Sequence, residues 1–281
     1  MKRLLRFLFI LGICAPLCAG CAGAVPADAS ADVCRDVAIV MYHSVLKDPA
    51  RTGKYVVSPE RLESDIVWLL DHGYTVVTAH AVVDFVKGMG PLPKKPVLLT
   101  FDDGYYNNLT YVLPLLQKYD CTAVIAIVGT YAQRFTDTPD PNPNYAHLSW
   151  DDIYALTLSG RIELANHTYD MHGQQGRMGS ARKSGESDAD YASAFTADVD
   201  RLQRELAARA FVTPTLFAYP YGIIDPDSRA LLREMGFSGS LSCREKISRV
   251  VRGDPETLWE LGRYNRAGDL TTEAFFSFLE K

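Results

Sequence analysis

The sequence predicts an α/β protein built around a parallel β-sheet. Strand-like and helix-like segments alternate along the chain, which is the pattern of strand–helix–strand units. Residues 96–101, Pro-Val-Leu-Leu-Thr-Phe, are apolar at nearly every position, as expected for a strand covered on both faces. Titratable residues directly follow several of these strands, where parallel α/β folds assemble their sites. We find no internal repeat and expect a single domain.

The other strands are predicted from short runs of apolar and β-branched residues. In chain order they lie at 37–43, 75–78, 122–128, 161–165, 215–219 and 237–242. The predicted helices alternate with them and lie at 59–71, at 81–87, from beyond Gly104 to 119, beyond Ser149, and at 189–209, 227–235 and 272–279. Ser58 favours the first helix because it can cap the N-terminus, with Pro59 and Glu60 in the first turn.

The composition is that of an ordinary globular domain, which we place at residues 36–281. The chain of 281 residues is 47% hydrophobic and 22% charged, which is enough for a large core. Removal of Lys2, Arg3 and Arg6 with a leader would take the formal net charge from −5 to −8. This balance disfavours nucleic acid as a partner, since such binding depends on lysine and arginine contacts to phosphate.

Residues 1–20 have the layout of a signal peptide, with basic residues, an apolar stretch at 4–17 and then small residues. The stretch is short for a membrane span. Cys21 ends a Cys-Ala-Gly-Cys run that resembles a bacterial lipobox, although leucine is usual where Cys18 stands. We therefore expect an exported protein that is either a cell-surface lipoprotein anchored at Cys21 or simply secreted. Residues 21–35, rich in Ala and Asp, are expected to form a tether.

Three cysteines follow Cys21, and they allow at most one disulfide that the sequence does not identify. They are Cys34, Cys121 and Cys243. Because Cys121 lies in an apolar, strand-like run, we expect it to be a buried free thiol.

Two adjacent carboxylates directly follow the strand predicted at 96–101. They belong to residues 100–104, Thr-Phe-Asp-Asp-Gly. Asp102 and Asp103 are costly to desolvate together unless a cation lies beside them. On a regular strand they would point to opposite faces, but Gly104 lets the chain turn so that both can converge on one site. Taken alone, the same residues are equally typical of a turn that caps a helix.

Two histidines follow the predicted strand at 161–165. His167 and His172 are five residues apart, which does not place them on one face of an α-helix, so a loop must bring them together. Two imidazoles and one carboxylate leave a divalent ion with open positions for water and substrate, as in catalytic metal sites. The alternative is a pair of unrelated surface histidines, and the two aspartates make the metal site the better interpretation.

The two aspartates in residues 100–104 and the two histidines in residues 167–172 resemble the motifs of the polysaccharide deacetylases with a NodB-homology domain, carbohydrate esterase family 4. The resemblance implies that Asp102 is the general base and that Asp103, His167 and His172 bind a divalent metal, with Zn²⁺ as the first candidate. The five-residue spacing of the histidines is similar to the branch that deacetylates poly-N-acetylglucosamine. The fold implied is an irregular (β/α) barrel of the NodB-homology type, and the resemblance covers roughly residues 36–281.

The third motif of the family has its counterpart in residues 217–222, Phe-Ala-Tyr-Pro-Tyr-Gly. The resemblance implies that Pro220 and Tyr221 contact substrate and that the backbone N–H of Tyr221 stabilises an oxyanion. Ala218 stands where many members have an arginine that orients the catalytic aspartate. Arg263 and Arg266 are the candidates to replace it, and we assign the base-orienting role to Arg263.

The general acid also departs from the usual pattern, because no histidine follows His172. His43 ends the predicted strand at 37–43, and it resembles the histidine that the poly-N-acetylglucosamine branch supplies from its first strand. We therefore assign the general acid to His43. We expect no catalytic role for His72, His80 and His147.

The resemblance implies a metal-dependent hydrolase that removes N-acetyl groups from N-acetylglucosamine units of an extracellular or cell-wall polysaccharide and releases acetate. Its partner would be that polysaccharide, with contact to a membrane only through a lipid on Cys21. The alternatives are a catalytically silent carbohydrate-binding member of the family and a deacetylase of another N-acyl substrate. The candidate aromatic platforms for sugar rings are Tyr105, Tyr106, Trp150, Tyr169 and Tyr221.

Overall fold

The computed structural model describes residues 33–173 and 176–280. The expected signal peptide at 1–20, the lipid anchor at Cys21 and most of the expected tether lie outside the described residues. Within the described part, no helix is both long enough and apolar enough to cross a bilayer.

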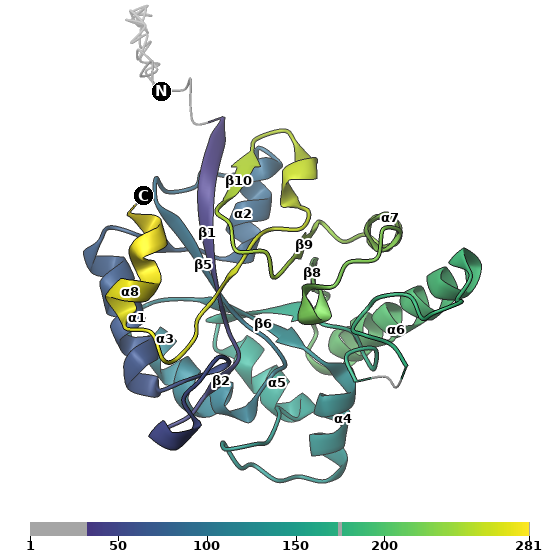
Figure 1. Cartoon of the computed structure of the whole chain (residues 1–281), viewed down its shortest axis with the longest axis horizontal. Coiled ribbons are helices and arrows are strands. Elements are labelled where there is room, and N and C mark those ends of the chain that lie inside the picture. Colours follow the sequence, from purple (N-terminus) through teal and green to yellow (C-terminus); the bar gives the residue numbers. More distant parts are fainter. Residues whose placement is uncertain (1–32, 174–175, 281) are drawn as a thin grey trace, which may run out of the picture. The chain divides into compact units, whose positions relative to one another are not determined.

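A mostly parallel sheet of nine strands forms the centre of the described fold (Figure 1). The strand order is β10-β1-β5-β6-β7-β8-β9, with β4 also paired to β5 and β11 also paired to β1. Only β10 runs antiparallel to its neighbour, β1. The strands are β1 (Cys34–Tyr42), β4 (Thr75–Val76), β5 (Pro96–Phe101), β6 (Ala123–Ile127), β7 (Ile162–Asn166), β8 (Leu216–Ala218), β9 (Gly239–Leu241), β10 (Ser248–Val251) and β11 (Tyr264–Asn265). A separate parallel pair consists of β2 (Ser44–Val45) and β3 (Val56–Val57).

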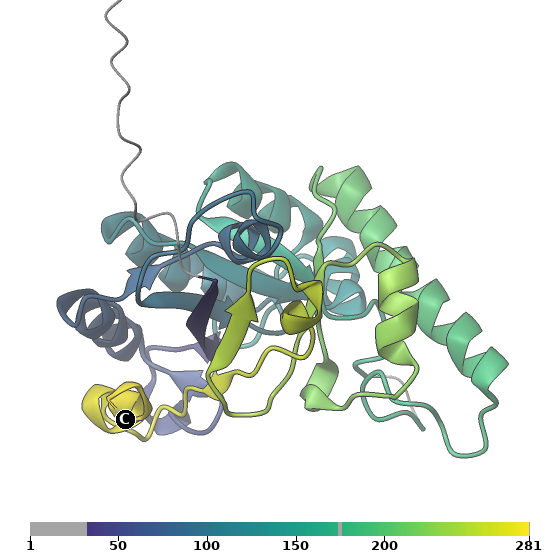
Figure 2. The same cartoon turned by 90° about the horizontal axis from the view of Figure 1, so that it is seen from above.

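Most of the helices lie outside the curled sheet, as Figures 1 and 2 show. They are α1 (Pro59–Asp71), α2 (Ala79–Val86), α3 (Leu113–Lys118), α4 (Gly129–Asp137), α5 (Trp150–Leu158), α6 (Asp188–Arg209), α7 (Ser228–Glu234) and α8 (Thr272–Phe276). The predicted caps are confirmed for two of them. Ser58 accepts a hydrogen bond from the N–H of Arg61, and Ser149 with Asp152 forms a reciprocal capping box.

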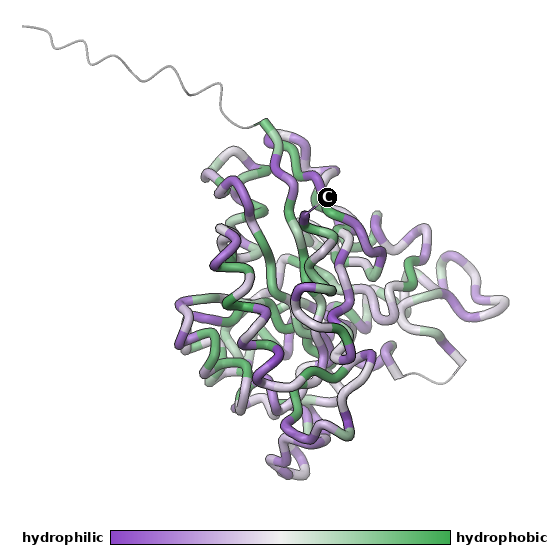
Figure 3. Tube along the Cα trace, turned by 60° about the vertical axis from the view of Figure 1, so that its left-hand side comes forward, coloured by the Kyte–Doolittle hydropathy of each residue, from purple (hydrophilic) through white to green (hydrophobic). Residues whose placement is uncertain are grey.

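The period-two alternation of the strands divides the core into an outer and an inner layer. Side chains such as Val40, Leu99 and Ile125 pack in one cluster with residues of the outer helices. The alternate positions, such as Ile39 and Leu98, pack in a second cluster with α2. Figure 3 shows the corresponding concentration of hydrophobic residues along the strands. The inner layer ends at the candidate site. The inward-facing positions that follow it along each strand lie at the carboxyl ends of the strands.

The sheet closes irregularly through the segment 261–265. Leu261 pairs with Leu241 at the end of β9, with its N–H donating to the carbonyl of Ser240 at 2.8 Å. Three residues later β11 pairs with β1, with Tyr264 opposite Val40. One short segment thus bridges the two sides of the sheet, which makes the fold an irregular (β/α) barrel and confirms the predicted fold class.

The sequence patterns predicted no helix where α4 lies and no strand where β10 and β11 lie. The N-terminus of α4 follows Val128, which makes no side-chain capping bond, so the usual start signal is missing. β10 and β11 are short segments that pair with β1 from the far end of the chain. The predicted helix beyond Gly104 contains a π-helical turn, Asn108–Val112, directly before α3. The expectation for Cys121 is confirmed, since it is buried and free, as Cys34 and Cys243 are also free.

Candidate active site

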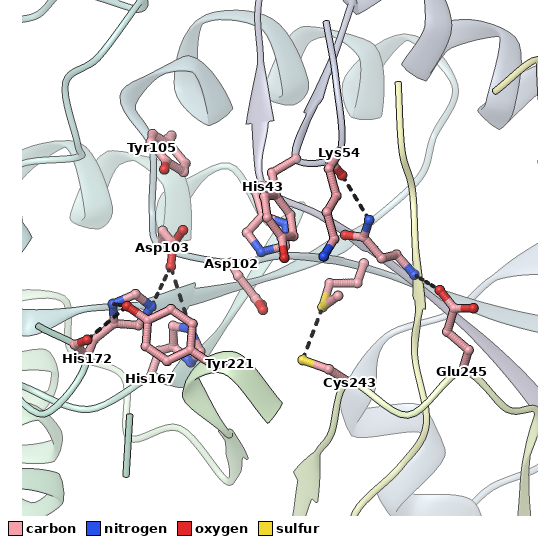
Figure 4. A pocket seen from close by; sticks show the side chains of 13 residues that line it. His43, Lys54, Asp102, Asp103, Tyr105, His167, His172, Tyr221, Cys243 and Glu245 are labelled. Atoms are coloured by element: carbon pink, nitrogen blue, oxygen red, sulfur yellow. Dashed lines mark hydrogen bonds and ion pairs between the residues drawn. The ribbon is translucent and has the colours of Figure 1, made fainter. Parts of the chain in front are cut away.

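The ends of β1 and β5 place a histidine beside an aspartate. Tyr42 and Phe101 are paired at the ends of these parallel strands, so His43 and Asp102 are the next residue on each. The backbone N–H of Asp102 donates to the carbonyl of Tyr42 at 2.9 Å and continues the pairing by one step. His43 and Asp102 therefore continue the inward-facing alternation of the barrel core and face one cavity (Figure 4).

A strained turn separates the two adjacent carboxylates. Asp103 has a φ of 70° and Gly104 a φ of 66°, so the aspartate itself adopts the left-handed conformation and not the glycine alone. For a residue other than glycine this costs about 1–3 kcal/mol, and such strain gathers at functional sites. The turn brings the Asp103 carboxylate to the cavity that also receives Asp102, as expected from the sequence.

The histidine loop brings His167 and His172 to the same carboxylate. The distance from Asp103 Oδ1 is 3.6 Å to His167 Nε2 and 3.2 Å to His172 Nε2. Thr168, between them, has a φ of 71°, and its Oγ1 accepts a hydrogen bond from the N–H of His172 at 3.1 Å. The left-handed residue and this bond reverse the chain, so that imidazoles five residues apart can converge.

A partly buried carboxylate on α6, that of Asp198, holds this loop in place. Asp198 accepts hydrogen bonds from three consecutive backbone N–H groups, those of Tyr169, Asp170 and Met171, at 2.7, 2.9 and 3.2 Å. Burial raises the pKa of Asp198, and the three N–H donors oppose that shift. No motif marks Asp198 in the sequence, because its partners are backbone groups about 28 residues earlier.

The donor atoms of Asp103, His167 and His172 fit a divalent metal. One ligand atom from each lies within 4.8 Å of the others, and residues 33–173 and 176–280 contain no other such group of three. His167 donates its Nδ1 proton to the carbonyl of Ala218 at 2.7 Å, which leaves Nε2 as the acceptor facing Asp103. Burial lowers the pKa of His167, so its imidazole is neutral, as a metal ligand must be.

Asp102 forms a buried, two-point ion pair with Arg263. Arg263 Nη1 lies 2.7 Å from Oδ1 and Nη2 lies 2.8 Å from Oδ2. Burial opposes ionisation of Asp102, but the Arg263 charge holds the pKa of this carboxyl well below its usual range. The pair exists because the closing segment 261–265 carries Arg263 into the barrel.

The other arginine candidate has a different partner. Arg266 is fully buried and pairs with Asp65 of α1, with 2.7 Å from Nε to Oδ2 and 3.0 Å from Nη2 to Oδ1. The same carboxylate accepts hydrogen bonds from Tyr42 and Thr272. This second ion pair links α1, β1 and α8, and it does not line the cavity.

His43 lies at the cavity wall with its Nδ1 buried. Among the described residues, none forms a hydrogen bond with this nitrogen. The imidazole packs on the ring of Tyr55, with 4.7 Å between ring centroids. A buried polar atom without a partner is costly.

The cavity has a volume of about 450 Å³. Tyr221 lines it and is 58% exposed, with a φ of 58°, whereas Pro220 is buried and does not line it. Figure 4 shows the group of Asp103, His167 and His172 on one side and Glu245 on the other. The remaining lining residues are Met41, Lys54, Tyr55, Tyr105, Cys243 and Asn265.

Several of the lining residues had no signal in the sequence. Lys54, Tyr55 and Glu245 belong to no motif and lie in loops that only the fold brings to the cavity. Conversely, two of the aromatic residues considered as sugar platforms, Trp150 and Tyr169, are buried in the core, so that expectation is wrong for them.

Comparisons with known proteins agree on one family. The family model described as polysaccharide deacetylase matches residues 89–240. Over 219 residues the chain is 27% identical to the poly-beta-1,6-N-acetyl-D-glucosamine N-deacetylase of Escherichia coli strain K12, a match that covers 70% of this chain and 32% of that protein. Over 192 residues it is 26% identical to the protein of the same name from Staphylococcus aureus strain MRSA252, covering 68% and 62%.

The solved structures show the same likeness. The de-N-acetylase from Aggregatibacter actinomycetemcomitans matches with a TM-score of 0.71 at 25% identity, over 87% of this chain and 98% of that one. The chain matches about a third of the length of the Escherichia coli relative and less than two thirds of the Staphylococcus aureus relative. Because the family model covers more than half of its residues, this chain belongs to the polysaccharide deacetylase family.

Proposed function

We propose that this protein is a zinc-dependent hydrolase that removes acetyl groups from N-acetylglucosamine units of an extracellular or cell-wall polysaccharide and releases acetate. The observation that carries the proposal is the convergence of Asp102, Asp103, His43, His167 and His172 on one cavity. The relatives named as poly-beta-1,6-N-acetyl-D-glucosamine N-deacetylases support this polymer as the first substrate to test.

Asp103, His167 and His172 are the residues that would hold the metal. Their two nitrogens and one carboxylate oxygen leave positions for water and for a substrate oxygen. When bound, the ion would acidify its water and polarise the acetamide carbonyl. The hydrogen bond from His167 to the carbonyl of Ala218 and the hydrogen bonds from the loop to Asp198 would keep the metal-binding side chains in place.

Asp102 is proposed to accept the proton of the attacking water as general base. Arg263 would keep the carboxylate ionised and fix its orientation through two hydrogen bonds. The arginine thus takes the place that the motif residue leaves open at Ala218, and it reaches Asp102 from a segment 161 residues further along the chain.

His43 is proposed to protonate the departing amine, which is a poor leaving group without a proton. It lies on the opposite side of Asp102 from the metal-binding residues in Figure 4, so it can reach the nitrogen of an acetamide whose carbonyl faces the metal. The backbone N–H of Tyr221 would donate to the oxyanion of the tetrahedral intermediate. The strained backbone at Tyr221 supports this role.

The cavity suits a sugar ring flanked by aromatic side chains. Tyr55 and Tyr221 both line it and are 47% and 58% exposed, so each offers an apolar ring face to a pyranose. We propose export of the protein by residues 1–20, with a lipid on Cys21 or release after cleavage and the residues that follow as tether. The expected boundary at residues 35 and 36 is wrong by two residues, because β1 begins at Cys34 and pairs with β10, so the proposed catalytic domain includes Cys34.

The test is acetate release from β-1,6- and β-1,4-linked N-acetylglucosamine oligomers by the zinc-loaded protein. Release from the β-1,6 series would support the proposal and identify the linkage, and release from the β-1,4 series alone would point to peptidoglycan or a chitin-like polymer. Zinc and oligosaccharide binding without acetate release would contradict the hydrolase and favour a carbohydrate-binding member of the family.

A further inference from the structure

His147 lies beside the metal-binding residues in a cluster of aromatic rings. It stacks on Tyr105, with 4.6 Å between ring centroids, and packs against Tyr131 at 4.4 Å and Phe135 at 5.7 Å. Tyr131 and Phe135 belong to α4, whereas Tyr105 follows the strained turn at Asp103. The imidazole therefore lies between the segment that follows Asp103 and α4, whose Tyr131 contacts His172.

Each of the two tyrosines reaches one of those residues. The Tyr131 hydroxyl lies 3.2 Å from Nδ1 of His172. Tyr105 lines the cavity beside Asp103, as Figure 4 shows.

The backbone fixes His147 at this position from both sides. The N–H of Leu148 donates to the carbonyl of Gly104 at 2.8 Å, and the N–H of Tyr106 donates to the carbonyl of Ala146 at 2.8 Å. The histidine thus has little freedom to move away from the turn that presents Asp103.

The first turn of α4 is attached to the histidine loop in a similar way. Gly129 and Thr130 donate their N–H groups to the carbonyls of Thr168 and Tyr169 at 3.1 and 2.7 Å. A Cβ on Gly129 would lie 2.2 Å from the Tyr169 ring, so only glycine permits this close approach. The position of Tyr131 beside His172 is consequently fixed.

The two ring nitrogens of His172 have different neighbours, Asp103 beside Nε2 and Tyr131 beside Nδ1. Nε2 faces Asp103, so a metal there requires the proton of this imidazole on Nδ1, where it donates to the Tyr131 oxygen. The Tyr221 hydroxyl also lies near Nδ1, at 3.4 Å, and because it donates its own proton to the backbone carbonyl of His172 at 3.1 Å, its oxygen can accept the same Nδ1 proton. Tyr131, at 3.2 Å, is the shorter of the two acceptors.

We propose that His147 is a positioning residue, an uncharged aromatic wedge that holds the Tyr131 hydroxyl on Nδ1 of His172 and so directs Nε2 to the metal. Burial lowers the pKa of His147 to about 4, so at neutral pH it adds no charge that would repel a divalent ion. The inference rests on the proposed metal site, and it assigns a role to a histidine for which the sequence indicated none.

The test measures zinc affinity by competition with a chromophoric chelator, and the visible spectrum of the Co²⁺-loaded protein. Both His147→Ala and Tyr131→Phe should weaken zinc binding about tenfold and shift the Co²⁺ bands. His147→Phe keeps a neutral ring and should bind zinc like the wild type. His72→Ala is the matched control, because His72 also stacks on an aromatic ring, but that ring is Trp68, which contacts none of the proposed metal-binding residues.

The double variant His147→Ala/Tyr131→Phe separates this role from a general loss of structure. If His147 acts through Tyr131, the double variant should lose about tenfold, as each single variant does, and not the product of the two losses. Wild-type affinity in His147→Ala, or a double variant that loses the product, would overturn the inference. Should His147→Ala fail to fold, His147→Gln takes its place with the same expectation.

The failure of the proposed metal site would look different. In that case the wild type would bind no zinc, or His167→Ala would bind it as tightly as the wild type does. Zinc bound by the wild type and lost in His167→Ala, with His147→Ala unaffected, would retain the metal site and reject only the role of His147.

Discussion

Arg263 and Asp102 are joined by two parallel hydrogen bonds inside the barrel, at 2.7 and 2.8 Å, with both side chains buried. A planar guanidinium matches a carboxylate in this two-point geometry, which a lysine cannot reproduce. The two residues come from distant parts of the chain, because the closing segment of the sheet supplies the arginine and the end of β5 supplies the aspartate. It links the closure of the fold to the proposed chemistry.

Replacing the base tests that chemistry directly. Asp102→Asn should lower turnover about 100-fold or more, since an amide cannot accept the proton, while zinc affinity stays near the wild-type value. The measurements are acetate release at saturating substrate and zinc titration. Asp65→Asn is a matched control, because it breaks the other buried aspartate–arginine pair outside the cavity. Turnover close to that of the wild type in Asp102→Asn would reject the assignment.

Removing the guanidinium should affect both activity and stability. Arg263→Gln leaves Asp102 buried without its charge partner, which costs about 3–5 kcal/mol of unfolding free energy. Above pH of about 4 the wild-type pair is fully ionised, and its contribution disappears only as the pH falls, because the pKa of Asp102 is lowered. In the variant, burial alone raises the pKa of Asp102, so stability falls as the pH rises from about 4 towards neutrality.

The stability difference between Arg263→Gln and the wild type should therefore be larger at about pH 8 than at about pH 5 in urea unfolding. Arg266→Gln provides the comparison for activity, since Arg266 is equally buried but pairs with Asp65. Both variants should be destabilised, and only Arg263→Gln should lose turnover in its folded fraction. Equal turnover in the two variants would mean that Arg263 has no more than a structural role.

The assignment of His43 can be tested with two kinds of leaving group. His43→Ala should hydrolyse N-acetylglucosamine oligomers about 100-fold more slowly, because the amine no longer receives a proton as it departs. An aryl acetate should be affected far less, since its phenolate departs without a proton. His80→Ala is the control, because the His80 side chain is 72% exposed and lies outside the cavity. An equal loss with both substrates would contradict a general-acid role.

Metal removal should abolish acetate release and lower the thermal stability of the protein. Zinc at about 100 times its dissociation constant should stabilise the folded state by about 2.7 kcal/mol. Thermal unfolding with and without a chelator measures this shift, and readdition of zinc should restore both activity and melting temperature. In His172→Ala, readdition of zinc should restore neither acetate release nor the melting temperature. A chelated protein that still releases acetate at the wild-type rate would exclude the proposed mechanism.

Tyr55 is expected to contribute to the binding of longer substrates. Tyr55→Ala should raise KM for an N-acetylglucosamine oligomer about 3- to 10-fold, as the loss of one aromatic contact predicts, while Tyr55→Phe should behave like the wild type. Steady-state kinetics with oligomers of increasing length measure the effect. Tyr145→Ala is the matched control, because Tyr145 is about as exposed but does not line the cavity. An unchanged KM would show that Tyr55 contacts no substrate.

Much of the fold could be predicted because its signals are local. β5 has the predicted bounds since a run of six buried residues needs no distant information to be recognised. α1 begins and ends as predicted because Ser58 and Pro59 specify its start within a few residues. α4 lacked such a cap, and β10 and β11 form only because β1 pairs with them from the other end of the chain.

The sequence by itself determined the residue types of the proposed site, namely Asp102, Asp103, His167, His172 and His43, together with the ends of the strands that carry them. These assignments depend on short motifs and on the two-residue period of strands, which operate over a few residues. From the sequence, Arg263 and not Arg266 was assigned as the partner of Asp102, but no local pattern distinguishes the two arginines.

Only the tertiary structure shows that Arg263 pairs with Asp102 and Arg266 with Asp65. It also determines the place of Tyr55 and the packing of His147 between Tyr105 and Tyr131. Each of these contacts includes a residue from a segment without regular periodicity. The direction of such a side chain is set by the pairing of the strands around it and by hydrogen bonds to distant backbone, neither of which a local pattern of residues contains.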